Sequence, residues 1–502
     1  MNKLVTSLAF LVGLSSQIVA CTLETPYGEA APSEKETPAA DPPAMPKDPM
    51  APAPTPAAGK AVVRVIHASA DAPSVDVYPK GSDKPIITGL TYGQTSGWLE
   101  LDPGTYVFEL RAAGAKPTDP IAYRTPDLVI PAGAKISAVA AGLLASKDSD
   151  AAFRVLPVVE GFGAAEAGKA RLRVLHAGSD APSVDLDVGN DDPGAPEVKD
   201  LARFADTGAA GVALPADTNL AVGIAAMGSR VTAFTTPKIP AGANVIVIAT
   251  GLLGKLARQG DGFSLLAIGP SGSLGFIKQD PIVYGLHGSP NAPRVDAFVG
   301  NAEIIDDIGF GELTKPIQVQ PGTYDIAWYA HTAGNARPAS AAAATTSTGK
   351  LEAGERYLAV ATGFLGLAGL EPFRLAAYRE AFALDTGKAQ LRAVHASPDA
   401  PMVDIGLANG AKIDPVLFAG LSFGQASAND GLSAPSGNLL VGVTPASVNT
   451  SIVARLTVAS EAQQRAFVIA SGALGAGRGQ GFRFLTVDTA KAPWTVTASL
   501  PH

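Results

Sequence analysis

The residues of this chain most able to carry chemistry are histidines and aspartates that recur in a repeated segment. Each copy places one histidine ahead of two acidic or amide side chains at fixed spacing. Carboxylates are hard oxygen ligands for divalent cations, and histidine with aspartate can hold a transition metal. The segment is therefore a candidate metal site, and a metal-dependent enzyme or metal carrier is one hypothesis. The recurring residues are His67, Asp71 and Asp76; His176, Asp180 and Asp185; His287, Asn291 and Asp296; and His395, Asp399 and Asp404.

A structural role for the same segment is the alternative, and we favour it. Alternation along a strand places Val63, Val65 and His67 on one sheet face, so that the histidine ends an apolar row. The Asp-Ala-Pro that follows is typical of turns, because Asp caps the bend and Pro fixes φ. In the third copy Asn291 keeps the hydrogen-bond acceptor but loses the charge, which suits a cap better than a metal ligand.

The other patterns of catalytic sites are missing from the sequence. A hydrolytic triad needs a nucleophile, a base and an orienting acid within reach, and no Gly-x-Ser-x-Gly elbow precedes a helix pattern. Glycine-rich stretches such as residues 472–477 lack the Lys-Ser/Thr of a phosphate loop. We therefore predict a non-enzymatic protein with no cofactor.

One aromatic cluster is a candidate ligand patch. Trp328 and Tyr329 are followed closely by His331, the one histidine inside the repeats that lies outside the repeated segment. Exposed aromatic rings are the usual platform of a sugar or peptide site. Burial of Trp328 in a core, like that of Trp98 in the first repeat, is the alternative, and we favour it.

The repeated segment returns about every 110 residues, and such a period indicates one domain copied in tandem. Short runs rich in β-branched residues, bounded by Gly and Pro turns, predict strands, and no amphipathic helix is evident. The predicted fold class is all-β. It consists of four tandem antiparallel β-sandwich domains, immunoglobulin-like or similar, after a disordered Pro-rich tether. We expect domains at 61–160, 168–276, 280–383 and 388–500, each closing its own core and folding alone.

The segment at residues 392–404 reads Arg-Ala-Val-His-Ala-Ser-Pro-Asp-Ala-Pro-Met-Val-Asp. It resembles the opening of the DUF4397 domain, a bacterial family of uncharacterised function, which reads R-V-x-H-A-S-P-D-A-P-x-V-D. The resemblance extends from about residue 61 to about residue 490. It implies an architecture and an exported or surface context, and it implies no activity.

The N-terminus has the layout of a secretory signal peptide over residues 1–20, with Lys3 ahead of an apolar run. The run ends Ile-Val-Ala-Cys, which resembles the bacterial lipoprotein box, and Cys21 is the only cysteine. That resemblance implies acylation of Cys21. Thr22 follows in place of the Asp that marks inner-membrane retention in enteric lipoproteins, so we expect the outer membrane. Residues 21–60 are then the lipidated cysteine and a proline-rich tether.

The composition narrows the set of partners. The formal net charge is −8, which disfavours nucleic acid and anionic lipid because both require a basic face. The expected partners are a membrane, held through the N-terminal lipid, and an envelope protein or glycan; the oligomeric state is left open. Together these features predict a lipoprotein anchored at the cell envelope that serves as a binding, adhesion or spacer rod.

Overall fold

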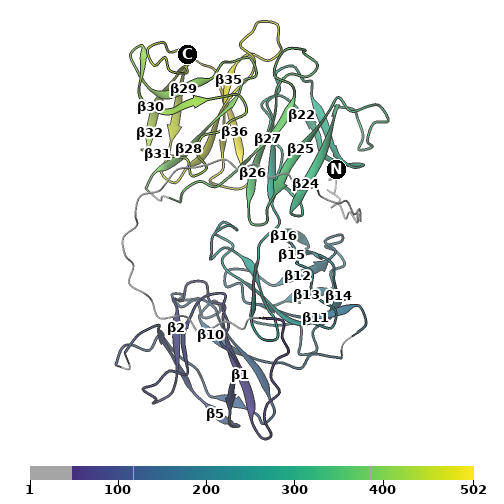
Figure 1. Ribbon diagram of the computed structural model, residues 1–502, viewed down its shortest axis with the longest axis vertical. Coiled ribbons are helices and arrows are strands. Elements are labelled where there is room, and N and C mark those ends of the chain that lie inside the picture. Colours follow the sequence, from purple (N-terminus) through teal and green to yellow (C-terminus); the bar gives the residue numbers. More distant parts are fainter. Residues whose placement is uncertain (1–47, 117, 165, 385–386, 502) are drawn as a thin grey trace. The chain divides into compact units, whose positions relative to one another are not determined.

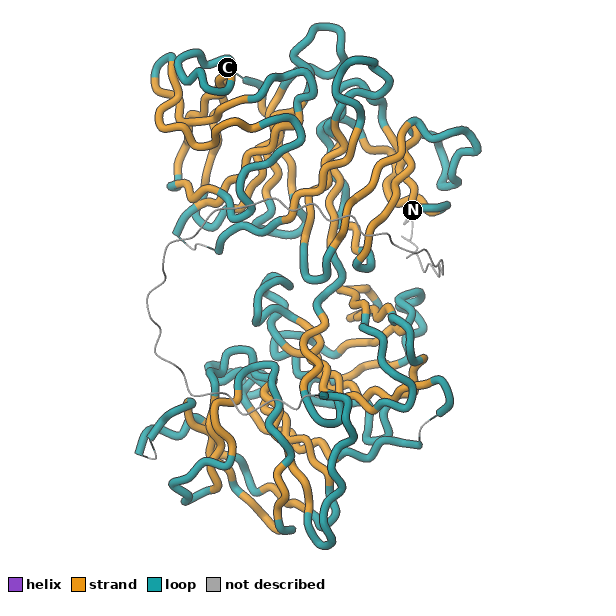
Figure 2. The backbone as a smooth tube through the Cα atoms, in the orientation of Figure 1, coloured by secondary structure: helices purple, strands orange, loops and turns teal. Residues whose placement is uncertain are grey.

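The structure, a computed structural model, describes residues 48–116, 118–164, 166–384 and 387–501. The predicted signal peptide, Cys21 and most of the predicted tether lie outside these residues. The described residues form strands and loops and contain no helix, so the predicted all-β class is confirmed (Figure 2). Accordingly, this part of the chain offers no apolar helix of membrane-spanning length.

The strands of all four repeats follow one plan of two sheets each (Figure 1). In repeat 1 the first sheet has the order β10-β9-β1-β4 and the second β3-β2-β6-β7, with a small β5-β8 pair beside them. The strands are β1 (Ala61–His67), β2 (Val75–Pro79), β3 (Ile87–Leu90), β4 (Leu99–Leu101), β5 (Gly104–Tyr106), β6 (Phe108–Ala112), β7 (Tyr123–Arg124), β8 (Leu128–Ile130), β9 (Lys135–Ala141) and β10 (Arg154–Val159).

Repeat 2 has the same arrangement with a fifth strand added to the first sheet. Its sheets have the orders β14-β11-β17-β18-β19 and β13-β12-β15-β16. The strands are β11 (Lys169–His176), β12 (Val184–Val188), β13 (Val198–Leu201), β14 (Val212–Pro215), β15 (Ala221–Ala226), β16 (Ser229–Thr235), β17 (Asn244–Thr250), β18 (Ser264–Ile268) and β19 (Ser273–Ile277).

Repeats 3 and 4 reproduce this alternation between four and five strands. Their first sheets have the orders β23-β20-β26-β27 and β31-β28-β34-β35-β36, and their second sheets β22-β21-β24-β25 and β30-β29-β32-β33. The strands of repeat 3 are β20 (Ile282–His287), β21 (Val295–Val299), β22 (Ala302–Ile308), β23 (Ile317–Gln318), β24 (Gly322–Ala330), β25 (Ala344–Leu351), β26 (Arg356–Thr362) and β27 (Arg374–Arg379). Those of repeat 4 are β28 (Ala389–Ala396), β29 (Val403–Asn409), β30 (Lys412–Leu421), β31 (Leu432–Ala434), β32 (Gly437–Pro445), β33 (Ala454–Ser460), β34 (Arg465–Ser471), β35 (Arg483–Asp488) and β36 (Thr495–Ser499).

One strand pair in each repeat is parallel, which the sequence prediction of antiparallel sheets did not include. The strand that ends in the repeated histidine runs parallel to the strand that precedes the Gly-Leu turn, as β1 does to β9 and β11 to β17. The same pairing joins β20 to β26 and β28 to β34. Parallel strands are usually buried on both faces and read as continuous apolar runs, and residues 245–248 of β17, Val-Ile-Val-Ile, are such a run.

Alternate side chains of these central strands enter two different cores. In β17, Val245 and Val247 pack inside the sandwich of repeat 2. Ile246 and Ile248 point to the opposite face and pack with Ile66 and Val139 of repeat 1. The expectation of four cores closed within themselves therefore needs correction, because both faces of the first sheet are covered.

Repeats 3 and 4 share a core of the same kind. Leu286 and Val360 of repeat 3 pack with Val394 and Ile469 of repeat 4, all of them buried. The contacts divide the described residues into two compact units, one ending at Lys278 and the other beginning at Gln279, and each unit holds one pair of repeats. We call these unit 1 and unit 2.

The fifth strand of each even repeat explains which neighbours pair. Phe276 of β19 lies against Tyr92 of repeat 1, with ring centroids 5.0 Å apart. In unit 2, Trp494, which immediately precedes β36, stacks on Tyr284 of repeat 3 at 4.2 Å. The odd repeats end at β10 and β27 without such a strand. Each fifth strand thus extends its own sheet and covers part of the preceding repeat.

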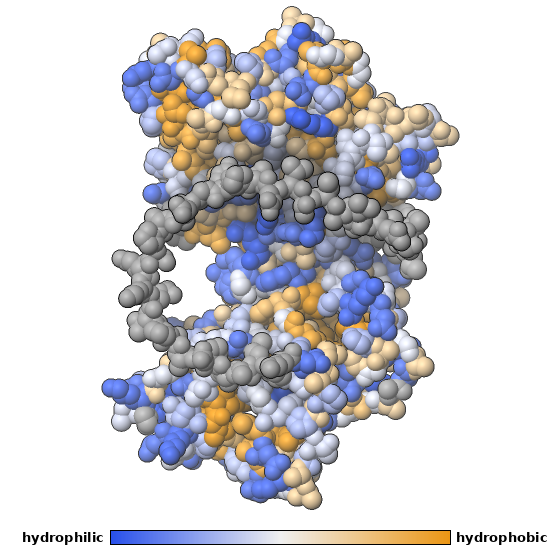
Figure 3. Space-filling view, in the orientation of Figure 1, coloured by the Kyte–Doolittle hydropathy of each residue, from blue (hydrophilic) through white to orange (hydrophobic). Residues whose placement is uncertain are grey.

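The last residues of the predicted tether are also held in unit 1. The backbone N–H of Ser271 donates to the Pro49 carbonyl at 3.1 Å, and its hydroxyl donates to the Ala51 carbonyl at 2.7 Å. Residues 49–51 therefore lie on the turn between β18 and β19 of repeat 2. The face drawn in Figure 3 mixes apolar and polar side chains. Val129 and Met227 are among the exposed apolar side chains of unit 1.

A folding prediction follows from the shared core. We expect residues 48–278 to fold cooperatively, whereas residues 165–275 alone expose Ile246, Ile248 and Leu266 and self-associate or lose stability. Circular dichroism during urea unfolding, together with sedimentation, measures both properties. A monomeric 165–275 fragment as stable as the two-repeat fragment would contradict the shared core.

Candidate functional site

The four repeated histidines occupy one environment. Each side chain is buried, and each Nε2 lies 2.8–3.0 Å from the carbonyl oxygen of the proline six residues further along the chain. These prolines are Pro73, Pro182, Pro293 and Pro401. A carbonyl oxygen can only accept, so Nε2 carries the proton in each ring. Burial lowers the pKa of all four histidines, and the rings are therefore neutral at pH 7.

An aromatic residue covers the histidine in three of the four copies. Tyr92, Phe310 and Phe423 meet His67, His287 and His395 edge to face, with ring centroids 6.2–6.3 Å apart. These aromatics belong to the turn that follows the first hairpin of each repeat. The histidine thus connects the end of a central strand to two loops. It reaches one through the hydrogen bond from Nε2 and the other through the contact with the aromatic ring.

The first acidic position of the segment caps a second loop. Asp71 accepts hydrogen bonds from the backbone N–H groups of Leu144 and Ala145 at 2.8 and 2.9 Å. Asp399 accepts from Leu474 and Gly475 at 2.8 Å each. Asp180 receives the equivalent bonds from Leu253 and Gly254 at 2.9 and 3.4 Å.

Asn291 shows why an amide can replace the carboxylate. Its Oδ1 accepts from the Leu365 N–H at 2.8 Å, as an aspartate would, and its amide group donates to the Leu365 carbonyl at 2.8 Å. Replacing Asp by Asn removes the charge that a metal ligand needs, whereas it gives a loop cap an additional hydrogen-bond donor. The geometry supports the structural role for this position.

The loop that is capped begins with a glycine that no other residue can replace easily. Gly142 has φ +84°, and a Cβ built on it would lie 2.3 Å from the Ala152 carbonyl oxygen. Gly363 has φ +88° and a corresponding distance of 2.1 Å to Pro372. Two backbone segments therefore lie in direct contact here, and a side chain at the glycine would separate them. The first acidic position holds the loop that starts at this contact.

The second acidic position joins two loops of the second sheet of each repeat, which we call the outer sheet. Asp76 accepts from the backbone N–H groups of Gly89 at 2.7 Å and Gly114 at 2.9 Å. Asp404 accepts in the same way from Gly420 at 2.7 Å and Ser447 at 2.8 Å. In repeat 2, Asp185 accepts from the Asp200 N–H at 2.8 Å. The histidine and the two acidic positions of a segment therefore bind three different sets of loop atoms and do not converge on one point.

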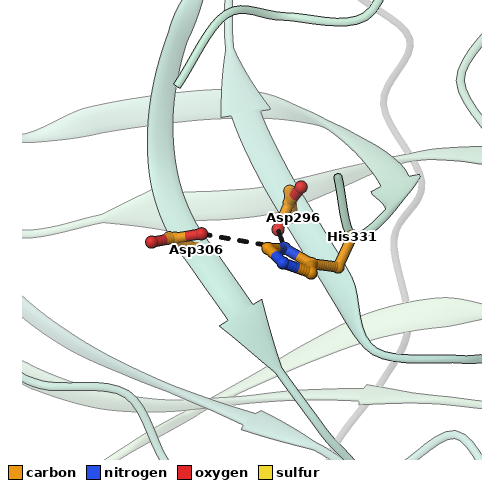
Figure 4. A group of neighbouring side chains, drawn as sticks. All are labelled: Asp296, Asp306 and His331. Carbon is orange, nitrogen blue, oxygen red and sulfur yellow. Dashed lines mark hydrogen bonds and ion pairs between the residues drawn. The ribbon is translucent and has the colours of Figure 1, made fainter. Parts of the chain in front are cut away.

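Repeat 3 departs from this plan at one place (Figure 4). Asp296 accepts from the backbone N–H groups of Asp307 and Thr332 at 2.9 and 3.0 Å, like its counterparts. In addition, Nδ1 of His331 lies 2.8 Å from Oδ1 of Asp296 and 3.7 Å from Oδ1 of Asp306. In the described part of the chain these three are the group of His, Cys, Asp and Glu side chains close enough to share a metal ion.

The charges around His331 set its protonation. The hydrogen bond to Asp296, and then the charges of Asp296, Asp307 and Asp306, raise the pKa of His331. Burial alone would raise the pKa of Asp296, but the two backbone N–H groups and His331 outweigh it and lower that pKa. Without a ligand the pair is therefore an imidazolium–carboxylate contact at mildly acidic pH.

The aromatic patch expected around His331 is not an exposed platform. Trp328 is buried and donates from Nε1 to the Thr346 hydroxyl at 2.8 Å. Tyr329, on the opposite face of β24, is also buried, and its hydroxyl accepts from Arg337 at 2.9 Å. Of the three residues only His331 reaches solvent, with 32% of its side chain exposed.

Several residues that matter here escaped the sequence reasoning. Arg64 is 1% exposed and donates to the Gly269 carbonyl of repeat 2 at 2.7 Å, and Arg173 donates to the Val159 carbonyl of repeat 1 at 2.5 Å. Arg392 donates to the Arg379 carbonyl of repeat 3 at 2.5 Å. An arginine three residues before the histidine in three copies was a visible signal for this role. Asp306 had no such signal, because it lies on a hairpin whose sequence differs between repeats.

Four copies of one two-sheet sandwich, each closed by the same His/Asp segment, define a tandem β-repeat protein. The family model described as Domain of unknown function (DUF4397) matches residues 61–187, 282–406 and 389–498, more than half of the chain, and the chain belongs to this family. The curated proteins contain no match.

Among solved structures, similarity is found to one titled "The Bacillus anthracis TIE protein". The match covers 80% of this chain and 67% of that chain at 9% identity, with a TM-score of 0.13. A likeness this low carries no argument about fold or function.

The histidine geometry leads to a stability prediction. We expect His395→Ala to lower the free energy of unfolding by about 1–3 kcal/mol, because a buried hydrogen bond and ring contacts are lost. Chemical denaturation measures the change. Val453→Ala, at an exposed position of the same repeat, is the control and should stay within about 0.5 kcal/mol. An equal effect of the two variants would contradict the structural role.

The buried histidines also predict a pH dependence. Their pKa values are lowered in the folded state, so the unfolded state binds protons first as the pH falls below about 6.5. Stability is fully present above that pH and is lost below it, by up to about 1.4 kcal/mol per pH unit for each histidine. Denaturation of residues 48–278 between pH 7.5 and 5.5 tests this, since unit 1 lacks the oppositely shifted His331. A free energy of unfolding that does not change over this pH range would show that folding leaves the pKa values of His67 and His176 unchanged.

Proposed function

We propose that this protein is a non-enzymatic, lipid-anchored component of the bacterial cell envelope that serves as a spacer and carries binding surfaces. The observation that supports this proposal most directly is the use of the repeated polar residues. The polar side chains of the His/Asp segment form hydrogen bonds with the loops of their own sandwich. The repeated residues therefore maintain the fold of each repeat.

The pairing of repeats supports a mechanical role. Each unit buries an apolar core between two sandwiches and adds polar ties across it. The hydroxyl of Thr250 donates to the Ala68 carbonyl at 2.6 Å, and that of Thr362 donates to the Ala396 carbonyl at 2.8 Å. A pair joined in this way resists bending between its two repeats, as a spacer requires.

The anchor is the part of the proposal that the sequence supports. Cys21 follows Ile-Val-Ala at the end of the apolar N-terminal run. Described structure begins at residue 48 and the first strand begins at Ala61. The proline-rich stretch between Cys21 and unit 1 would hold the first pair of repeats clear of an outer membrane. An envelope protein or glycan is the proposed class of ligand for the exposed faces.

The anchor is tested by Cys21→Ser. We expect the variant to lose incorporation of labelled fatty acid and to leave the membrane fraction, because the acylated residue supplies the membrane affinity. Metabolic labelling and fractionation of cells measure both effects, with Thr22→Ser as the control. Equal membrane association of the Cys21→Ser variant and the parent would contradict the lipid anchor.

The spacer role has a separate test. Removal of residues 279–502 deletes one complete unit and keeps both repeats that form the shared core of unit 1. A spacer should keep its function in part after this deletion, whereas an adhesin whose ligand binds unit 2 should lose binding entirely. A screen of glycans and envelope proteins against the full chain and the shortened chain distinguishes the two.

A further inference from the structure

We propose that repeat 3 binds one divalent transition-metal ion, with Zn²⁺ as the fitting case, through His331, Asp296 and Asp306. This site is independent of the repeated histidines and of the lipid anchor. It lies where β21, β22 and the end of β24 meet on the outer sheet of the sandwich (Figure 4).

The donor set suits such an ion. Zinc accepts imidazole nitrogen and carboxylate oxygen at about 2.0–2.2 Å in tetrahedral geometry, which places neighbouring ligand atoms about 3.4 Å apart. Nδ1 of His331 lies 2.8 Å from Oδ1 of Asp296 and 3.7 Å from Oδ1 of Asp306, so small movements bring all three into range. The ion replaces the proton that Nδ1 and Asp296 share, and that proton is released.

The rigidity of the site is supplied by the fold. Asp296 is 1% exposed and is fixed by two backbone N–H groups, so its carboxylate cannot turn away. Asp306 and His331 are partly open to solvent, with 54% and 32% of their side chains exposed, and leave an approach for the ion. The nearby Arg294 is held by Asp307 and Glu312 and is directed to those carboxylates.

The other three repeats serve as an internal comparison. The registers of β2 with β6, β12 with β15 and β29 with β32 place Ala113, Met227 and Ala446 at the position of His331. The backbone bonds to the second acidic position place Thr88, Lys199 and Ala419 at the position of Asp306. The sandwich therefore forms with neither side chain in three copies out of four. In repeat 3 both appear together on opposite sides of the shared aspartate, where folding does not require them.

Four of the five described histidines cannot compete for the ion. His67, His176, His287 and His395 are buried, and each uses Nε2 for a backbone carbonyl. A single substitution at His331 therefore isolates the proposed site.

The test uses the full chain, free of tags and stripped of metal by dialysis against chelator. Calorimetric titration with Zn²⁺ should show one ion per chain. His331→Ala and Asp306→Ala should each weaken binding by at least about tenfold, and both should keep the parent's unfolding midpoint, since repeat 4 carries alanine at both positions. Asp325→Asn, an exposed carboxylate on β24, is the matched control and should bind as the parent does.

A transplant tests whether these side chains are sufficient. Ala419→Asp with Ala446→His places the same pair around Asp404 in repeat 4, and the stoichiometry should rise from one ion to two. Co²⁺ in place of Zn²⁺ should give visible absorption bands that disappear in His331→Ala. No binding by the parent, unchanged binding by His331→Ala, or a stoichiometry that stays at one in the transplant would overturn the proposal.

Discussion

The architecture depends on a pair of parallel strands that is buried on both faces. β1 with β9, and the equivalent pairs in the other repeats, send one set of side chains into their own sandwich and the alternate set into the neighbouring repeat. A strand with two apolar faces cannot be left at a surface, because the second face would stay in contact with water. The need to cover that face is what makes two repeats the structural unit.

The repeated segment meets a second constraint, which is that the loops around these strands must be held in a fixed conformation. The histidine closes one loop through its Nε2, the first acidic position caps the Gly-Leu turn, and the second joins two loops of the outer sheet. Where these backbone groups are buried, leaving one unpaired would cost about 1–3 kcal/mol. The segment therefore recurs because every copy has the same loops to hold, and repeat 3 could add His331 and Asp306 around an aspartate that was already fixed.

Much of the fold could be predicted from the sequence, and the reason is local. Runs such as residues 245–248 and the Gly and Pro turns indicate strands and their ends, and the spacing of the histidines indicates four copies. Pairing between strands is a non-local property, so the parallel register of β11 with β17 and the shared cores were not evident. The apolar runs did contain the signal, because unbroken Val and Ile predict burial on both faces.

The candidate site divides in the same way. Turn chemistry in Asp-Ala-Pro, and the exchange of Asp for Asn291, pointed to caps, and the bonds to Leu144 and Leu365 have that character. The approach of Asp306 to His331 depends on the register between β21, β22 and β24, which no short stretch of sequence encodes. The sequence of this hairpin differs between repeats, so the role of Asp306 becomes visible only when the fold places it beside His331 and Asp296. Repetition makes that visible, because the three copies without the pair show what the fold needs and the third repeat shows what has been added to it.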